Sequence, residues 1–176
     1  MSRSLIVMRH SKSSWPVSVP DLERPLSKRG KLDAKQAGRV IAADLPRPDL
    51  IVVSPARRAE ETLKLAGGEL PEVATEVDER VYGATWWELA DVIRDTSASV
   101  ETLMLIGHNP GLDDLVGQLA AGGDPVALRQ LRLKFPTSAI ALLTEDAGAA
   151  AGSGAGGWAD WNAGTARLDR LLIPRG

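Results

Sequence analysis

The sequence contains two histidines, His10 and His108, and each stands within two residues of the end of an apolar run. Arg9 directly precedes His10, and Arg58 follows a third apolar run after a short turn. A neutral imidazole can act as a nucleophile, whereas the guanidinium fork of arginine binds two oxygens of an anion at once. Positive charge beside an imidazole also lowers its pKa and favours the neutral form that a nucleophile needs. Together these side chains suit the binding and transfer of a dianionic phosphoryl group without a metal ion.

The three apolar runs predict short strands that are buried on both faces, and these strands must position the candidate side chains. The runs cover 5–8, 50–53 and 103–106, and their continuous apolar character is typical of a parallel sheet with helices on both faces. In such a sheet the ligand crevice lies outside the carboxyl ends of the strands. One histidine or one arginine alone is more often an ordinary surface residue. Four such side chains at three strand ends favour a common site.

The rest of the pattern places helices between the strands and predicts a three-layer α/β/α fold with a mostly parallel central sheet. Ser27 and Ser54 are predicted to cap helices, the second of which has Pro55 in its first turn. Thr85 and Glu88 have the spacing of a capping box. The predicted helices cover 28–44, 55–66, 85–94 and 112–121, and the further predicted strands cover 72–77, 139–144 and 166–173.

The composition narrows the classes of function. Lys and Arg number 21 and Asp and Glu 23, so the net charge is -2; we expect no nucleic acid partner and no attraction to an anionic membrane. The absence of cysteine excludes disulfides, thiolate catalysis and Cys-ligated metal, and it suits a reducing compartment. No apolar run approaches about 20 residues, so we expect a cytoplasmic protein. The length suits a single domain over 1–176, with a flexible loop at 147–157, where Gly, Ala and Ser predominate.

Five segments resemble the motifs of the histidine phosphatase superfamily, also called phosphoglycerate mutase-like. The segments are Arg9-His10, Arg24-Pro25-Leu26-Ser27, Ser54-Pro55-Ala56-Arg57-Arg58-Ala59-Glu60-Glu61-Thr62, Gly107-His108-Asn109-Pro110 and Phe135-Pro136-Thr137-Ser138-Ala139. Together they span most of the chain. Within the superfamily the sequence is most similar to the SixA-type phosphohistidine phosphatases, which share its compact length.

This resemblance implies a role for each matching side chain. His10 would be the nucleophile that forms a transient phosphohistidine, and Arg9, Arg58 and His108 would hold the phosphoryl oxygens. The implied reaction needs no metal and no other cofactor. The implied partner is a phosphorylated protein or a small phosphorylated substrate.

The crevice is expected to be shallow and open. Between the strand that ends before Ser54 and the strand that ends before His108, the chain has room for about one strand and two helices, but not for a large helical cap. An open site admits a phosphohistidine on the surface of another protein. Trp86 and Trp87 could also line a rim, although at least one of them is expected to pack inward. The candidates for substrate contacts at the rim are Lys12, Ser13, Trp15 and Arg57.

Departures from the family's patterns leave the general acid unassigned and keep other functions open. The acid phosphatase branch usually has Asp after the second histidine, where this chain has Asn109, which cannot donate a proton as a carboxylic acid does. Asp78, Glu79 and Tyr82 are candidates for this role only by position. Mutases commonly have Gly-Glu after the Arg-His pair, where this chain has Ser11-Lys12. The alternatives are a small-molecule phosphomonoesterase or mutase of the same superfamily, and a non-catalytic module that only recognises phosphate.

Overall fold

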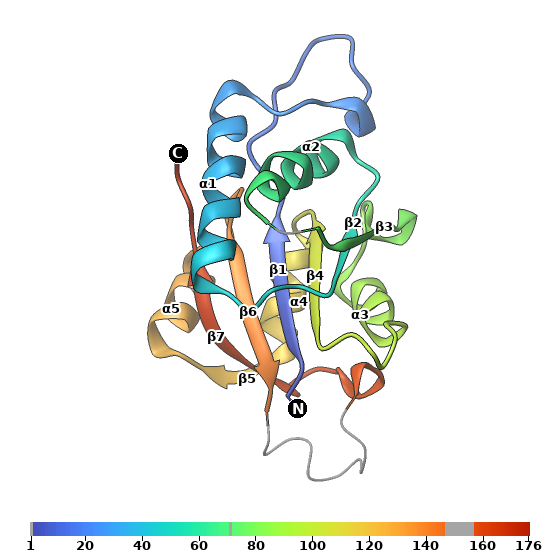
Figure 1. The fold of residues 1–176 in the computed structure, drawn as a ribbon, viewed down its shortest axis with the longest axis vertical. Coiled ribbons are helices and arrows are strands. Elements are labelled where there is room, and N and C mark those ends of the chain that lie inside the picture. Colours follow the sequence, from blue (N-terminus) through green and yellow to red (C-terminus); the bar gives the residue numbers. More distant parts are fainter. Residues whose placement is uncertain (1, 71, 147–156) are drawn as a thin grey trace.

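A seven-stranded sheet forms the middle layer of the computed structural model, which describes residues 2–70, 72–146 and 157–176 (Figure 1). The strands are β1 (Ser4–Arg9), β2 (Leu50–Val53), β3 (Ala74–Val77), β4 (Thr102–Gly107), β5 (Ala120–Gly123), β6 (Ile140–Glu145) and β7 (Ala166–Leu172), in the order β3-β2-β4-β1-β6-β7-β5. Neighbouring strands from β3 to β1 run parallel, as do β7 and β5. Only β6 is antiparallel to its two neighbours within this sheet, so the sheet is mostly parallel.

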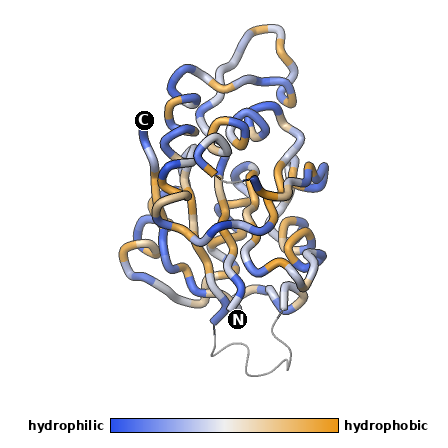
Figure 2. Tube along the Cα trace, in the orientation of Figure 1, coloured by the Kyte–Doolittle hydropathy of each residue, from blue (hydrophilic) through white to orange (hydrophobic). Residues whose placement is uncertain are grey.

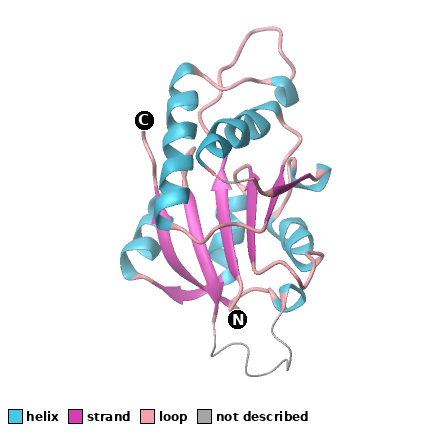
Figure 3. Ribbon diagram, viewed as in Figure 1, coloured by secondary structure: helices cyan, strands magenta, loops and turns pink. Residues whose placement is uncertain are grey.

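Helices cover both faces of the sheet, which gives three layers (Figure 3). α1 (Lys28–Asp44) and α2 (Arg57–Ala66) bury their apolar side chains on one face. α3 (Trp86–Arg94), α4 (Gly111–Leu119) and α5 (Pro125–Leu133) bury theirs on the other face. The predicted three-layer α/β/α class is confirmed.

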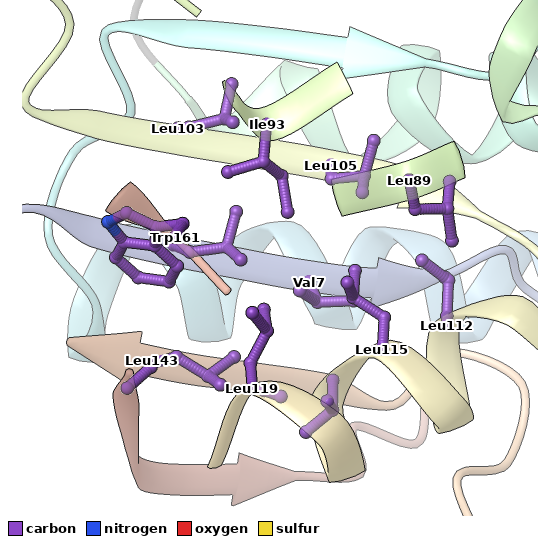
Figure 4. Packing of buried hydrophobic residues seen from close by; sticks show 14 of the residues in the cluster. Val7, Leu89, Ile93, Leu103, Leu105, Leu112, Leu115, Leu119, Leu143 and Trp161 are labelled. Atoms are coloured by element: carbon purple, nitrogen blue, oxygen red, sulfur yellow. The ribbon is translucent and has the colours of Figure 1, made fainter. Parts of the chain in front are cut away.

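The central strand β1 shows why the apolar runs are continuous. Leu5 and Val7 belong to the hydrophobic cluster on the side of α3 and α4, whereas Ile6 and Met8 belong to the cluster on the side of α1 and α2. Successive side chains of a strand point to opposite faces, so both faces of β1 must be apolar when both are covered. Figure 4 shows Val7 among leucines of α3, α4 and β4, and Figure 2 shows hydrophobic stretches along the central strands.

The predicted start of the second helix at Pro55 is wrong. α2 begins at Arg57, and Ala56 before it has extended backbone with φ -64° and ψ 131°. The Ser54 hydroxyl accepts a hydrogen bond from the N–H of Ala56 and lies 2.7 Å from Nε2 of His108. Ser54 therefore does not cap the helix, because its hydroxyl is committed to the turn and to the second histidine.

The predicted helix over 112–121 is right in its centre and wrong at its end. α4 ends at Leu119, and the next four residues form β5, which pairs with β7 at the edge of the sheet. This segment reads Ala-Ala-Gly-Gly, which carries no strand signal of its own. The sequence prediction also missed α5, although Asp124 accepts hydrogen bonds from the N–H groups of Val126 and Ala127 and Pro125 occupies the first turn. An Asp-Pro pair of this kind is a recognisable helix start.

The other predicted helix starts are confirmed. The Ser27 hydroxyl accepts from the N–H of Gly30 at 3.0 Å, as an N-cap does. The Glu88 carboxylate accepts from the N–H of Thr85 at 2.8 Å, which is the reciprocal bond of a capping box. The loop predicted at 147–157 lies, apart from Gly157, outside the described residues. Among the described residues, no helix is long and apolar enough to cross a membrane.

Gly38 lets the backbones of α1 and α2 approach closely, and this contact predicts an effect on stability. A Cβ at this position would lie 2.3 Å from the carbonyl oxygen of Ala66. We expect Gly38→Ala to lower the free energy of unfolding by about 1 to 2 kcal/mol, because overpacking against backbone outweighs the helix propensity of Ala, about 1 kcal/mol. Gly117→Ala in α4 is the matched control, since a Cβ there meets nothing within 4 Å. Urea unfolding of both variants checks this, and equal effects would contradict it.

Candidate active site

One pocket at the carboxyl ends of β1 and β4 brings the four main candidate residues together. The pocket has a volume of about 250 Å³, which is small for a ligand site. Its lining consists of Arg9, His10, Lys12, Ser13, Trp15, Arg24, Arg58, His108, Asn109 and Thr137. Parallel pairing of β1 with β4 places Arg9 opposite Gly107, so the residue after each strand faces the same crevice. As predicted, the residues that follow the strand ends lie together at one pocket.

His10 is buried and held in one tautomer. His10 directly follows β1, and its backbone N–H donates to the backbone carbonyl oxygen of Gly107 at 3.1 Å. Its Nδ1 lies 2.7 Å from the carbonyl oxygen of Ser11. A carbonyl oxygen can only accept, so Nδ1 carries the proton and the lone pair is on Nε2. This is the atom that a nucleophilic histidine needs free.

Both histidines are neutral at pH 7. Burial lowers the pKa of His10 to about 3, and the charges of Arg58 and Arg9 act in the same direction, against the hydrogen bond to Ser11. Burial and the charge of Arg58 lower the pKa of His108 to about 4. The two rings lie side by side, with their centroids 5.1 Å apart. The site therefore presents two uncharged imidazoles among cations.

Arg58, and not Arg57, faces the pocket. Arg58 is 6 % exposed and donates from Nη1 to the carbonyl oxygen of Asp21 at 2.7 Å and from Nη2 to the carboxylate of Asp21 at 3.1 Å. A guanidinium has five N–H groups, so Arg58 has donors beyond the two that bond to Asp21. Arg57 is exposed, does not line the pocket, and pairs with Glu61 at 2.8 Å.

Arg9 and His108 each present a buried atom that has no partner among the described residues. Arg9 donates from Nη1 to the carbonyl oxygen of Phe135 at 3.1 Å, while its Nε is unpartnered. His108 contacts the hydroxyl of Ser54 through Nε2, while its Nδ1 is unpartnered. Buried polar atoms without partners are costly and are common where a ligand completes the bonding. Both side chains line the pocket, so an oxyanion there can supply the missing partners.

Asp21 is a site residue that the sequence analysis missed. Its carboxylate accepts from Arg58, from Nη1 of Arg24 at 2.9 Å and from the hydroxyl of Tyr82 at 2.7 Å. The hydrogen bonds from Tyr82 and Arg24 hold the pKa of Asp21 well below its usual range, so this group is an anion and not a proton donor. It lies in the short helical turn Asp21–Glu23 within a proline-containing loop, where no periodic pattern marks it.

None of the three residues considered as a general acid by position lines the pocket. Asp78 pairs with Arg80 at 2.8 Å, and Glu79 lies beside it in the turn before Tyr82. Tyr82 stands edge-on to the ring of His108, with centroids 5.7 Å apart. Its hydrogen bond to Asp21 raises its pKa, so Tyr82 acts as a neutral donor to that carboxylate.

The candidates for the rim divide into exposed and buried side chains. Lys12 and Trp15 are exposed at the pocket, and the guanidinium carbon of Arg24 lies 3.2 Å from the centre of the Trp15 ring. Ser13 is 7 % exposed, and its hydroxyl accepts from Nη2 of Arg24. Ser13 therefore orients Arg24. Asn109 follows the second histidine, where the acid phosphatase branch has Asp. Its side-chain amide N–H donates to the carbonyl oxygen of Phe135 at 2.8 Å.

Within 2–70, 72–146 and 157–176, no three His, Asp or Glu side chains come together as metal ligands do. The cationic groups that line the pocket are instead the guanidinium groups of Arg9, Arg24 and Arg58. A mostly parallel α/β/α fold that brings two histidines and three arginines to one pocket is typical of a phosphoryl-binding protein.

Comparison with known proteins identifies the family. Residues 5–100 match the model of the histidine phosphatase superfamily (branch 1), and the chain belongs to that superfamily. It is 36% identical over 170 residues to the uncharacterized protein Rv1276c of Mycobacterium tuberculosis, covering 96% of this chain and 100% of that one. It is 28% identical over 145 residues to the phosphohistidine phosphatase SixA of Escherichia coli, covering 81% and 85% of the two chains.

A solved structure agrees with this assignment. The structure of a proposed phosphohistidine phosphatase SixA from Nakamurella multipartitia superposes with a TM-score of 0.83 at 26% identity, covering 99% of this chain and 97% of the other. The structure of the protein histidine phosphatase SixA complexed with tungstate gives 0.73 at 23% identity, covering 97% of each chain, and shares the fold. The family and these neighbours indicate a phosphatase.

The lowered pKa values predict that both histidines stay neutral in the free protein at about pH 5, well below the ordinary pKa of about 6.5. Since the chain has only two histidines, an NMR titration of imidazole nitrogens reports on them directly, with His10→Gln for assignment. The unfolded chain takes up protons below about pH 6.5 and the folded chain does not, so stability should fall as the pH is lowered from 7 to 5. A folded-state titration of His10 near its ordinary pKa would contradict the assigned burial.

Asp21 holds the Arg58 fork, and its removal should therefore impair turnover. We expect Asp21→Asn to lower kcat/KM for a phosphoramidate by about tenfold, since a charge-assisted anchor is replaced by a weaker neutral one. Glu23→Gln in the same turn is the control, because Glu23 is exposed and does not contact Arg58. Unchanged kinetics in Asp21→Asn, with an unchanged circular dichroism spectrum, would show that Arg58 holds its place without the carboxylate.

Proposed function

We propose that this protein is a metal-independent phosphohydrolase that removes phosphoryl groups from protein phosphohistidine through a phosphohistidine intermediate on His10. The observation that carries the proposal is the hydrogen bond from Nδ1 of His10 to the carbonyl oxygen of Ser11. It leaves the lone pair of Nε2 free in a pocket lined by Arg9, Arg58 and His108. The SixA relative is named a phosphohistidine phosphatase, which supports the choice of substrate.

In the first step, Nε2 of His10 attacks the phosphorus atom and the bond from phosphorus to the leaving nitrogen breaks. The electron pair of that bond goes to the leaving ring nitrogen. The other nitrogen of the substrate imidazole is protonated from solvent before cleavage, so the ring leaves neutral. Arg9 and Arg58 face the charge on the transferring oxygens, and His108 adds a hydrogen bond once it carries a proton on the facing nitrogen. These cations take the place of a metal ion in neutralising the phosphoryl group.

In the second step, water attacks the phosphorus atom on His10. The bond from phosphorus to Nε2 breaks, the electron pair returns to Nε2, and the proton of the water leaves with the phosphate or to solvent. His10 is then neutral again and ready for another turnover. Its lowered pKa suits this step, because an imidazole that resists protonation returns to the nucleophilic form at pH 7.

A phosphoramidate suits a pocket that lacks a carboxylic acid. Asn109 stands where a proton donor was considered, and Asp21 is held as an anion by its hydrogen bonds. An alcohol leaving group needs a proton in the transition state, whereas a protonated imidazole leaves as a neutral ring. The absence of a carboxylic acid among the residues that line the pocket therefore favours P–N over P–O cleavage.

The surroundings of the pocket suit a macromolecular substrate. Between β2 and β4 the chain forms α2, β3 and α3 with short helical turns, and no separate cap arises from this described segment (Figure 1). Trp15 is 75% exposed at the rim. An open pocket encloses a small ligand poorly but can receive a phosphorylated side chain that projects from another protein.

The proposal is tested by trapping the intermediate. Brief reaction with a phosphohistidine protein carrying labelled phosphorus, followed by rapid quenching, should leave an acid-labile and base-stable label on His10. The label should be absent in His10→Ala and should form in the presence of EDTA, because no metal takes part in the step. Glu76→Gln, at an exposed position of β3, serves as the unaffected control.

Three results would overturn the proposal. They are a label on His108, a label that persists in His10→Ala, and a loss of labelling with EDTA that Mg²⁺ restores. Preference for a sugar phosphate over phosphohistidine protein by orders of magnitude would leave the nucleophile intact but would replace the substrate.

A further inference from the structure

A second pocket shares a wall with the candidate active site. It has a volume of about 200 Å³, and its residues include His108 and Asn109, which also line the phosphoryl pocket. The rest of the lining comes from the start of α3 and the start of α4, namely Gly83, Ala84, Thr85, Trp86, Trp87, Pro110, Gly111 and Asp114. A group bound in this second pocket therefore lies next to a phosphoryl group bound beside His108.

Two indole rings form an aromatic corner in this second pocket. Trp86 is partly buried and packs against the core, whereas Trp87 is 54% exposed. Their ring centroids are 5.9 Å apart and the rings are nearly perpendicular, at 84°. Of the five tryptophans, the two that are more than half exposed are Trp15 and Trp87, and each lines one of the two neighbouring pockets. The expectation that one residue of the Trp86-Trp87 pair packs inward is confirmed, and the other is left available for contact.

A carboxylate completes the second pocket. Asp114 is exposed at its edge, and its carboxylate forms no ion pair within the described part of the chain. The neighbouring acids differ, since Glu88 accepts from Thr85 and Asp91 pairs with Arg94. Apolar walls with an aromatic face and one unpaired negative charge match a side chain that has an aliphatic stem and a cationic head. An acidic side chain is disfavoured there by Asp114.

We propose that the Trp87 and Asp114 pocket is a subsite for a Lys or Arg side chain that lies near the phosphohistidine of the substrate protein. The proposal rests on the proposed function and adds the sequence context that the enzyme selects. The alkyl stem of the basic residue packs on the indole of Trp87, and its charged head reaches the carboxylate of Asp114. His108 and Asn109 lie between this basic residue and the phosphoryl group, so one substrate can contact both pockets at the same time.

The experiment compares phosphohistidine peptides that differ at one position. Each peptide contains one histidine, phosphorylated with phosphoramidate, and a single Lys, norleucine or Glu at one of the four positions on either side. Norleucine has a straight aliphatic stem without the charge. We expect a Lys peptide to be hydrolysed with a kcat/KM about tenfold above its Glu counterpart at the best position, with norleucine between them.

Variants assign this preference to the subsite. Trp87→Ala should lower kcat/KM for both the Lys and the norleucine peptides by about threefold to tenfold, and Asp114→Asn should remove most of the difference between Lys and norleucine. Hydrolysis of free phosphoramidate, which reports on the phosphoryl pocket alone, should stay unchanged in both variants. The matched controls are Leu133→Ala, a 79% exposed apolar residue of α5, and Glu76→Gln, an exposed carboxylate of β3.

The outcomes separate the subsite from the function. Equal rates for Lys, norleucine and Glu peptides at every position, with His10-dependent hydrolysis of all of them, would overturn the subsite and leave the phosphatase function standing. A preference for Glu would also overturn it. Failure of every phosphohistidine peptide and of free phosphoramidate as substrates would instead overturn the proposed function. A Lys preference that Trp87→Ala and Asp114→Asn leave intact would place the recognition elsewhere on the surface.

Discussion

The hydrogen bond between Nδ1 of His10 and the carbonyl of Ser11 is the interaction on which the site depends. Its direction places the proton on Nδ1 and the lone pair on Nε2, and this assignment depends on the position of the Ser11 carbonyl. Ser11 is fully buried and is held from two sides, because its N–H donates to the hydroxyl of Thr62 in α2 and its hydroxyl contacts that of Ser138. Thr62 in turn donates to the carbonyl of Arg58. His10 and Arg58 are thus tied to one buried hydrogen-bond network.

Charge balance is the second constraint. Arg9, Arg24 and Arg58 converge on the two histidines. Burial lowers both imidazole pKa values, and the charges of Arg58 and Arg9 act in the same direction. The carboxylate of Asp21 offsets part of this positive charge. It also holds the guanidinium groups of Arg24 and Arg58 in place, and each of these groups has further N–H donors. These donors are already in place for a dianionic ligand, and preorganised donors of this kind need little reorganisation when charge shifts.

The strand ends of the site could be predicted from the sequence, but the contribution of the loop that holds Asp21 could not. Apolar runs are read directly, because a strand covered on both faces must be apolar throughout, and the parallel arrangement then places His10 and His108 together. Asp21 escaped prediction because its contacts to Arg58 and Tyr82 join residues far apart in the chain and follow no period. The helix start at Ser54 failed for a related reason. The Ser54 hydroxyl contacts His108, which is 54 residues away in the chain, and capping rules consider only residues nearby in the sequence.

The shared wall of the two pockets explains why Asn109 suits this chain in place of an acid. Its amide donates to the carbonyl of Phe135, the same oxygen that receives Nη1 of Arg9, so Asn109 links the turn after β4 to the arginine beside the nucleophile. A carboxylate there would place two acceptors against each other and would face the bound phosphoryl group with like charge. The neutral amide keeps a donor on the carbonyl of Phe135 and adds no negative charge to the pocket. Under the proposed function, a pocket without this negative charge suits a leaving group that is protonated before cleavage, such as an imidazole.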